Sequence, residues 1–368
     1  MIDNFSFFKY PGSKKGSLVT LDEYLPPEFN DYYEPFVGSG ALALSTYIGN
    51  KRISINDIND NIISNYINIS KSYKTIVHYL KKRENKFKSA DFIPYIKTFK
   101  NSNTFKRFKK KYEFEPRPIK PTDNDNSDEY NIKISERELI YYLFRKEFNK
   151  LISENSKSFK HTILFLFLNR TCFNGVYRES HNGRYNVPFN KEDWTKKGFD
   201  NDIVREDFLS KASQLIQKFK IYNKDYKYIF AKAKKNDFLY IDPPYSPISE
   251  TSKFTEYTKG GFDDKYQREL YHEIVKLHKK GCKFLLSNSN NKFIKKLYRS
   301  DKSIKFHIKP VTMGRSIQNW NSNKKENETK LNNEHNEVLI FNYSKSRGPK
   351  QKELPFFQIK QTGDINHC

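Results

Sequence analysis

The sequence predicts an α/β fold built around a parallel sheet. Two segments carry this prediction, residues 32–40 and 53–60, because in each a short apolar run ends in a turn and leads into a helical pattern. Strands that feed helices in this way form parallel βα units. A chain of 368 residues is also long enough for about two to three domains of roughly 150 residues each.

The first half of the chain begins with these two units. Residues 32–37 are expected to form a strand, followed by a Gly38-Ser39-Gly40 turn and a helix from Ala41. Residues 53–56 form a second strand ending at Asp57, with a helix from about residue 59. Residues 62–112 are helical in pattern and increasingly basic. Residues 113–135 combine prolines with Asp, Asn and Ser, which indicates an exposed loop or insertion; a plain linker explains them equally well.

The second half returns to sheet signals. A helix is expected over 136–148, and the apolar segment 161–168 leads into residues 169–189. The Asn174-Gly175 and Asn182-Gly183 pairs there, among alternating aromatics, predict hairpin structure. Further strands are expected at 220–223, 238–241, 282–286 and 338–343, and the tail from residue 344 is basic and loose. A central region therefore interrupts one α/β domain.

Charge gives the first functional indication. Lys and Arg number 67 against 43 Asp and Glu, a net charge of +24. Such an excess suits a polyanion, because each neutralised phosphate releases counterions and strengthens binding. The alternative is codon bias, since the chain is also rich in Asn and Ile, as proteins of AT-rich genomes are.

Several classes of protein are excluded. No apolar stretch approaches 18 residues, which argues against a membrane span. The first residues have no apolar signal core, so a cytoplasmic protein is expected. The three cysteines are far apart without a CxxC motif, and the eight histidines are scattered, so neither a disulfide framework nor a metal is expected.

The sharpest local feature is Asp242-Pro243-Pro244-Tyr245, directly after the apolar run 238–241. The two prolines remove two N–H donors and impose an extended turn at the carboxyl end of a strand, where ligands bind in α/β sheets. A carboxylate and a proline carbonyl there would accept the two N–H bonds of an exocyclic amine on a planar substrate, while the tyrosine side chain stacks on the ring of that substrate. The alternative is a rigid surface turn.

Two further segments point to a cofactor. Residues 34–40, EPFVGSG, form a glycine turn that lets the backbone approach a ligand closely. Asp57 ends the next strand, where acidic residues bind ribose hydroxyls in Rossmann-like sites; as an alternative it caps the following helix. The basic turn at Lys9-Tyr10-Pro11-Gly12-Ser13-Lys14 would by itself be any loop.

In combination these segments resemble one family. FKYPGSK at 8–14, EPFVGSGAL at 34–42, INDIND at 55–60, LNRTCFNGVYR at 168–178, GRYNVPF at 183–189 and DPPY at 242–245 with SETSKFTEYT at 249–258 occur in the order found in Dam-like (D12 class, alpha group) DNA adenine-N6 methyltransferases. The resemblance covers most of residues 5–343 and weakens across about 85–135 and 300–336.

The resemblance implies a fold and a domain organisation. The fold is a Rossmann-like, S-adenosylmethionine-dependent methyltransferase domain with an inserted, mostly helical target-recognition domain carrying a β-hairpin. Residues 1–62 and 197–345 would be the two parts of the catalytic domain, with residues 63–196 as the inserted domain and an insertion near 113–135. Residues 346–368 would be a basic flexible tail.

The resemblance also implies the reaction. S-adenosylmethionine would donate a methyl group to N6 of an adenine flipped out of duplex DNA, which is required because the amine is otherwise held in the base pair. The implied cofactor-binding residues are Tyr10, Lys14, Glu34, Phe36, Gly38, Gly40, Asp57 and Asp242, and the implied catalytic residues are Asp242, Pro243, Pro244 and Tyr245.

The implied DNA-binding residues are Lys9, Asn169, Arg170, Phe173, Asn174, Val176, Arg178 and Pro188. Phe173 matches an aromatic wedge, Asn174 a contact to an orphaned base, and Pro188 a contact to a thymine methyl. Arg178 and Lys9 match residues that read guanines, which together suggests the target GATC. The alternatives are hairpin core for Phe173, a phosphate contact for Arg178 and a solvated loop charge for Lys9.

The sequence departs from the family pattern at several positions. Tyr10 stands where the family commonly has Trp, Asn190 where Gly is common, and residues 315–336 have no family interpretation.

Asp242 argues against cytosine-N4, RNA and protein-glutamine enzymes of this fold. A DNA-binding regulator with a decayed site would show damage to DPPY, Lys14 or the glycine turn, and all are intact. A nuclease would need a carboxylate cluster, and none is evident. A companion restriction endonuclease would be a functional partner.

Overall fold

The computed structural model describes residues 7–45, 48–116, 130–195, 202–245, 264–313 and 337–344. A seven-stranded sheet has the order β5-β2-β1-β6-β7-β9-β8. Among the described strands of this sheet, β9 runs opposite to the other six and pairs antiparallel with β7 and β8. The strands are β1 (Tyr32–Glu34), β2 (Ile53–Asn56), β5 (Lys220–Tyr222), β6 (Phe238–Ile241), β7 (Lys283–Ser289), β8 (His307–Val311) and β9 (Glu337–Phe341). The expected α/β fold is confirmed; β8 was not predicted.

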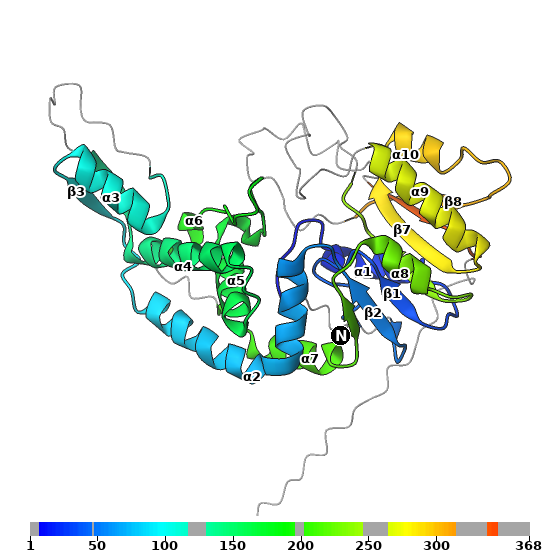
Figure 1. Ribbon diagram of the computed structural model, residues 1–368, viewed down its shortest axis with the longest axis horizontal. Helices are drawn as coiled ribbons and strands as arrows, with labels where there is room; N and C mark the ends of the chain where they lie inside the picture. The colour runs from blue at the N-terminus through cyan, green and yellow to red at the C-terminus, as the bar shows by residue number, and fades with distance from the viewer. Residues whose placement is uncertain are drawn as a thin grey trace, which may run out of the picture.

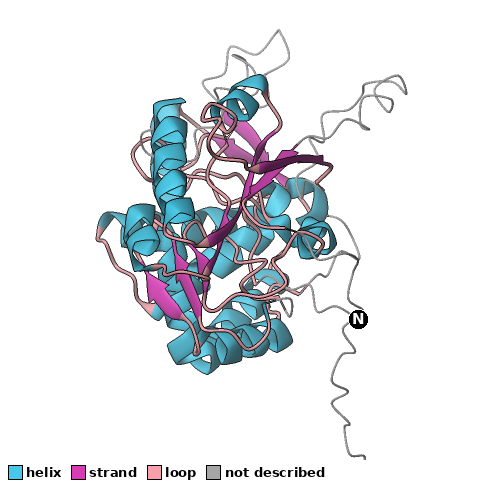
Figure 2. Cartoon of the chain, turned by 90° about the vertical axis from the view of Figure 1, so that its right-hand side faces the viewer, coloured by secondary structure: helices cyan, strands magenta, loops and turns pink. Residues whose placement is uncertain are grey.

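The sheet is covered on both faces (Figure 2). Along β6, Phe238 and Tyr240 enter one hydrophobic cluster, and Leu239 and Ile241 enter another on the opposite face. The second cluster packs against α8 (Tyr226–Lys232), α9 (Asp264–Lys279) and α10 (Lys292–Leu297). The first packs against α1 (Leu18–Asp22), which follows the 3-10 turn η1 (Lys14–Ser17), and the start of α2 (Asp60–Lys88). Burial on both faces explains why these strands are continuously apolar.

The long helix α2 connects the sheet to the helical part of the chain (Figure 1). It packs against α5 (Phe159–Thr171) and α7 (Glu206–Ile216), and α5 packs against α4 (Glu136–Ser153). The hydrophobic cluster on this face of the sheet continues among these helices as far as α6 (Lys191–Trp194). Because one core spans both parts, the division at residues 62 and 196 stays a prediction.

A small lobe lies at the far end of α4 from the sheet (Figure 1). It consists of β3 (Tyr95–Phe99), α3 (Ser102–Tyr112) and β4 (Tyr130–Ile134), and the two strands pair antiparallel; we call it the α3 lobe. The continuous helical pattern expected over 62–112 is therefore wrong at 95–99, as is the loop at 130–134. Phe99, Phe105 and Phe108 pack together, so cross-strand and helix packing favours these strands. Residues 117–129 lie outside the described part.

Two other expectations changed in detail. Instead of the helix from Ala41, residues 41–45 form successive turns, and the Ala43 N–H is bonded to the Glu34 side chain, 3.1 Å away. Residues 169–189 pair as a hairpin through isolated bridges, Cys172 with Phe189 and Glu179 with Tyr185, after the 3-10 turn η3 (Phe173–Gly175). Residues 249–258, 315–336 and 346–368 lie outside the described part. Among the described helices, none has the length and apolar character needed to cross a bilayer.

Candidate active site and nucleic-acid interface

The site residues gather where the strand order reverses. The chain starts at β1, moves outward to β2 and β5, and returns to β6 on the other side of β1. The glycine turn therefore follows the carboxyl end of β1, and DPPY follows the carboxyl end of β6. This is the position where α/β sheets bind ligands. Both motifs follow these strands directly, so their local placement results from strand and turn patterns alone.

Asp242 lies in a network of charged and polar groups. The Lys14 Nζ is 3.1 Å from Asp242 Oδ1 and 3.6 Å from Glu337 Oε2. The Tyr245 hydroxyl lies 3.1 Å from Asp242 Oδ1 and donates to Glu337 Oε2 at 2.7 Å, and Lys14 Nζ is 4.8 Å from the Tyr245 ring centroid. Asp242 is 17% exposed and Lys14 5%. DPPY is therefore a half-buried turn whose Asp242 and Tyr245 side chains belong to a charged cluster, and its catalytic role stays a prediction.

Burial changes how the carboxylates of the site titrate. It raises the pKa of Asp242 to about 6, opposed by the Lys14 ammonium and reinforced by the Glu337 carboxylate. Burial also raises the pKa of Glu34 to about 8, even though the Tyr32 hydroxyl donates to its carboxylate. At pH 7, Asp242 is therefore mostly ionised and Glu34 mostly protonated.

The two prolines present different carbonyls. The Pro244 carbonyl accepts a hydrogen bond from Gln267 Nε2 at 3.1 Å, and Gln267 is itself held by Asn288 at 3.0 Å. Among the described residues, none donates to the Pro243 carbonyl. Pro243 is therefore the proline whose carbonyl can accept a hydrogen bond from a ligand beside Asp242.

The glycine turn needs its glycines. Gly38 and Gly40 have φ of +46° and +63°, and a Cβ on Gly40 would lie 2.6 Å from the Tyr66 hydroxyl oxygen. That hydroxyl donates to the Gly38 carbonyl at 2.9 Å. The Tyr10 ring packs against Gly38. Phe36 turns away from the turn and packs against Tyr226 of α8, with ring centroids 5.2 Å apart.

Asp57 is bonded to this turn. Its Oδ2 accepts from the Gly38 N–H at 3.0 Å and its Oδ1 from the Asn59 N–H at 2.9 Å. Burial raises its pKa, against these backbone hydrogen bonds. The N-cap of α2 is Asn59, whose side chain accepts from Asn61 N at 2.9 Å, so the alternative that Asp57 caps this helix is wrong. An ionised carboxylate accepts about four hydrogen bonds, which leaves Asp57 capacity for a ligand.

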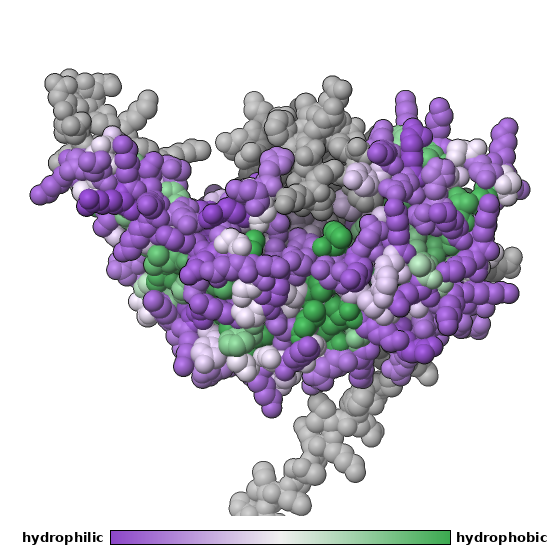
Figure 3. All heavy atoms as spheres, viewed as in Figure 1, coloured by the Kyte–Doolittle hydropathy of each residue, from purple (hydrophilic) through white to green (hydrophobic). Residues whose placement is uncertain are grey.

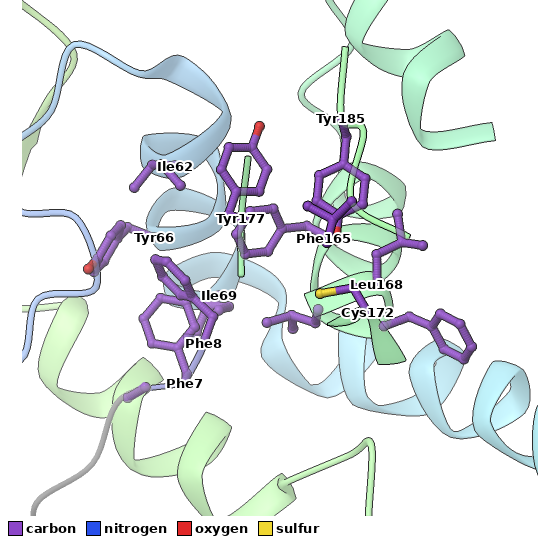
Figure 4. Close-up of a cluster of buried hydrophobic side chains, with 14 of the residues drawn as sticks. Phe7, Phe8, Ile62, Tyr66, Ile69, Phe165, Leu168, Cys172, Tyr177 and Tyr185 are labelled. Carbon is purple, nitrogen blue, oxygen red and sulfur yellow. The ribbon is translucent and has the colours of Figure 1, made fainter. Parts of the chain in front are cut away.

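The basic loop and the 169–189 hairpin are joined by Asn169. This asparagine is 2% exposed, and its side chain bonds both backbone groups of Lys9 and the Gly175 carbonyl. Aromatic packing beneath this junction joins Phe8 to Phe165 of α5 and Phe165 to Tyr177, with centroids 5.1 and 5.0 Å apart (Figure 4). The basic loop and the hairpin thus share one hydrophobic core.

The remaining hairpin residues divide into exposed and buried positions. Phe173 is 42% exposed, so the alternative that it is hairpin core is wrong. Lys9, Arg178 and Pro188 are also exposed, whereas Asn174, Val176 and Arg170 are half-buried. Arg178 Nε donates to Asn186 Oδ1 at 2.9 Å, which leaves its two terminal nitrogens for other contacts. Arg170 faces α7, and burial lowers its pKa with Arg205 nearby.

The surface of the α3 lobe is hydrophilic and carries exposed basic side chains (Figure 3). The face in Figure 3 is largely hydrophilic, including the α3 lobe. Lys106, Arg107, Lys110 and Lys111 of α3 are exposed. Among the described residues, no group of three or more His, Cys, Asp or Glu side chains is arranged to hold a metal ion.

Sequence reasoning missed two residues of this site, Glu337 and Gln267. Glu337 is 92 positions from Tyr245 and precedes the last apolar strand, and an acidic residue beside a buried strand was the only available signal. Gln267 lies inside α9 and is fully buried, and an isolated polar residue on an amphipathic helix carries no local signal.

Comparisons with known proteins agree with this geometry. The family model of the D12 class N6 adenine-specific DNA methyltransferases matches residues 10–317. The chain is 31% identical over 345 residues to Type II methyltransferase M.MjaIII of Methanocaldococcus jannaschii, covering 92% of this chain and 98% of that protein. It is 28% identical over 332 residues to the DNA adenine methylase of Escherichia coli K12, covering 89% and 95%, and 25% identical over 339 residues to Type II methyltransferase M1.LlaDCHI of Lactococcus lactis, covering 92% and 95%.

The family match spans the glycine turn, the hairpin and DPPY, and the structure brings the first and last of these together at one edge of the sheet. The chain therefore belongs to the D12 class of N6 adenine-specific DNA methyltransferases.

Proposed function

We propose that the protein transfers the methyl group of S-adenosylmethionine to N6 of an adenine flipped out of duplex DNA, within GATC. The observation that carries this proposal is the Asp242–Lys14 contact of 3.1 Å at the carboxyl end of β6, next to the glycine turn of β1. The contact supports the proposal because Asp242 would accept the amine, and the glycine turn would hold the cofactor, at one switch point of the sheet.

The residues of the glycine turn fit a cofactor. A turn with positive φ and no Cβ exposes backbone that a ligand can approach closely, and Tyr10 provides an aromatic face beside Gly38. Asp57 would accept ribose hydroxyls, and Lys14 and Glu34 would line the pocket. When bound, the cofactor supplies a methyl group made electrophilic by a sulfonium charge.

DPPY would receive the adenine. The Asp242 carboxylate and the Pro243 carbonyl would each accept one N–H of the amine, and the Tyr245 ring would stack on the base. The adenine amine is a poor nucleophile because its lone pair is delocalised into the ring. Two acceptors that favour a tetrahedral nitrogen stabilise the transition state more than the ground state. This role requires Asp242 to be ionised, which its pKa of about 6 permits at pH 7.

The hairpin would open and read the duplex. The Phe173 ring would wedge into the stack that the flipped base leaves, a role that its exposure supports, and Asn174 would meet the orphaned base. Arg178 would read a guanine through the terminal nitrogens that Asn186 does not engage. Lys9 would read the second guanine, and Pro188 would contact the thymine methyl. The buried Asn169 would act through Lys9, whose backbone it holds.

Methylation of an unmethylated plasmid tests this function. Purified protein and S-adenosylmethionine are added, and single-molecule sequencing maps every modified base, with the Asp242→Ala variant as the control. We expect N6-methyladenine confined to GATC. N6-methyladenine at another motif would refute the assignment of Lys9 and Arg178 as guanine readers. No modification by a protein that binds the cofactor would refute the DNA substrate.

A restriction endonuclease as companion belongs to the same proposal, because two relatives carry the name Type II methyltransferase. If the protein protects DNA, the plasmid methylated in this assay resists a GATC-cleaving endonuclease that methylation of the adenine blocks. Cleavage of the treated plasmid would show that its GATC sites stay unmethylated and would argue against protection.

A further inference from the structure

Glu337 is a buried carboxylate inside the proposed active site. It is the first residue of β9 and 5% exposed. Its Oε2 accepts from the Tyr245 hydroxyl at 2.7 Å and lies 3.6 Å from Lys14 Nζ. Glu337 therefore contacts Lys14, which is the charged partner of Asp242, and the hydroxyl of Tyr245, which belongs to the same turn as Asp242.

The contacts define a charge balance. Lys14 Nζ donates to the Gly12 carbonyl at 3.2 Å and lies near both carboxylates. Coulomb attraction falls inversely with distance, so at equal dielectric the attractions of Lys14 to Asp242 and Glu337 differ by only about one seventh. One ammonium is thus shared between two carboxylates. Without the Glu337 carboxylate, the Lys14 ammonium would pair with Asp242 only, and the cluster would lose its net negative charge.

We propose that Glu337 is a positioning residue for methyl transfer: it takes a share of the Lys14 charge and orients Tyr245, so that the cluster around Asp242 presents a net negative charge to the substrate amine. This inference rests on the proposed function. As the amine nitrogen is methylated, its lone pair becomes the new N–C bond, and the thioether that leaves keeps the electrons of the broken S–C bond. The nitrogen is cationic until it releases one proton to water, and a net negative cluster beside it stabilises that charge.

The other titratable groups around Asp242 do not disturb this balance. Tyr245, Tyr240 and Tyr32 all face the cluster, and burial raises the pKa of each well above its usual value, so all three are neutral. Glu34 faces it from β1, with its pKa raised to about 8. The charge balance therefore rests on the contacts of Lys14 with Asp242 and Glu337.

The test compares Glu337→Gln with wild type. Glutamine keeps the size of the side chain and an oxygen for Tyr245, but removes the charge. We expect single-turnover methylation to slow by about tenfold, less than the loss of a group that touches the oxyanion in other enzymes. We also expect the acid limb of the pH–rate profile to move to lower pH, because Glu337 no longer raises the pKa of Asp242.

Equilibrium binding gives a readout independent of turnover. The net negative cluster should favour the cationic S-adenosylmethionine over the neutral S-adenosylhomocysteine, and Glu337→Gln should reduce that ratio of affinities. The matched control is Glu138→Gln, a carboxylate that is 2% exposed and paired with Lys191 away from the site. The control should keep the wild-type pH limb and affinity ratio.

Two results would overturn the inference: an unchanged rate, or a slower rate with an unchanged pH limb and affinity ratio, which would make Glu337 purely structural. If Glu337→Gln does not fold, the double variant Lys14→Gln/Glu337→Gln is compared with Lys14→Gln, because removing both partners leaves no unpaired charge. The pH at which S-adenosylmethionine binding is lost should then be lower in the double variant, and equal values would overturn the inference. Failure of the wild-type protein to methylate plasmid would instead refute the proposed function.

Discussion

Lys9 and Asn169 lie 160 positions apart and hold each other by two reciprocal hydrogen bonds. The Lys9 N–H donates to Asn169 Oδ1 at 2.8 Å, and Asn169 Nδ2 donates to the Lys9 carbonyl at 2.9 Å. The loop that leads to the proposed cofactor pocket is thereby fastened to the base of the hairpin. This pair therefore connects the loop proposed to line the cofactor pocket with the hairpin proposed to read DNA.

Asn169→Ala should release that connection. The variant leaves buried backbone groups unsatisfied, which costs about 1–3 kcal/mol of unfolding free energy, and it frees Lys9 to move. We expect a lower melting temperature together with methylation at near-cognate sites, measured by thermal unfolding and plasmid sequencing. The control is Asn85→Ala at an exposed position of α2. Unchanged specificity in Asn169→Ala would show that Lys9 does not depend on this pair.

Gly40→Ala should disrupt the glycine turn. The added Cβ would lie 2.6 Å from the Tyr66 hydroxyl at a φ of +63°. Gly49→Ala is a matched control, because Gly49 has a φ of +64° with nothing within 4 Å of the added carbon. Both variants carry the left-handed backbone penalty of about 1 kcal/mol. A greater loss of cofactor affinity and stability in Gly40→Ala than in Gly49→Ala therefore measures the clash with the Tyr66 hydroxyl. Adding Tyr66→Phe should restore part of that loss, and equal effects at the two glycines would contradict the crowding argument.

Activity should depend on the ionisation of Asp242. Its pKa of about 6 lies above the usual value, and the proposed role needs the charged form. The rate should therefore be constant well above pH 6 and fall about tenfold per unit below it. Asp242→Asn should abolish transfer while cofactor binding stays measurable by calorimetry. A rate that did not fall between pH 6 and pH 4, in protein still folded by circular dichroism, would exclude Asp242 as the titrating acceptor.

Arg178→Ala should relax discrimination at one base pair. A bidentate contact to guanine is worth about 1–3 kcal/mol, so the preference for GATC over sites changed at that guanine should fall by that amount. Arg184→Ala in the same hairpin is the control, because Arg184 pairs with Glu113. Competition binding with variant duplexes measures both. Uniformly weaker binding to all duplexes would instead identify Arg178 as a phosphate contact.

The α3 lobe should contribute to the salt dependence of DNA binding. Replacing Lys106, Lys110 and Lys111 by Gln should lower the slope of log affinity against log salt by about 0.9 for each DNA phosphate that these lysines neutralise. The same replacement at Lys279, Lys292 and Lys296, on the α9–α10 side of the sheet, is the control for net charge. Fluorescence anisotropy on a long duplex gives both slopes. Equal slopes in the two triple variants would mean that the lobe lies outside the DNA footprint.

Consecutive residues predict several strands and turns of the site. The apolar run 238–241 and the two prolines that follow Asp242 determine both β6 and the turn that holds Asp242, and the glycines after β1 determine the glycine turn. Residues 53–57 likewise predict β2 and the place of Asp57. These predictions succeed because strand burial and turn chemistry are local and are written in consecutive residues.

The distant residues that complete the site are brought there by tertiary packing. Glu337 reaches Tyr245 because β9 pairs antiparallel with β7, a register that no local pattern encodes. Asn169 reaches Lys9 through the packing of α5, and β3 and β4 form because they pair across a segment of more than 25 residues rather than from their own propensity. Pairing over such separations depends on the cooperative packing of the whole core, which a single sequence does not display.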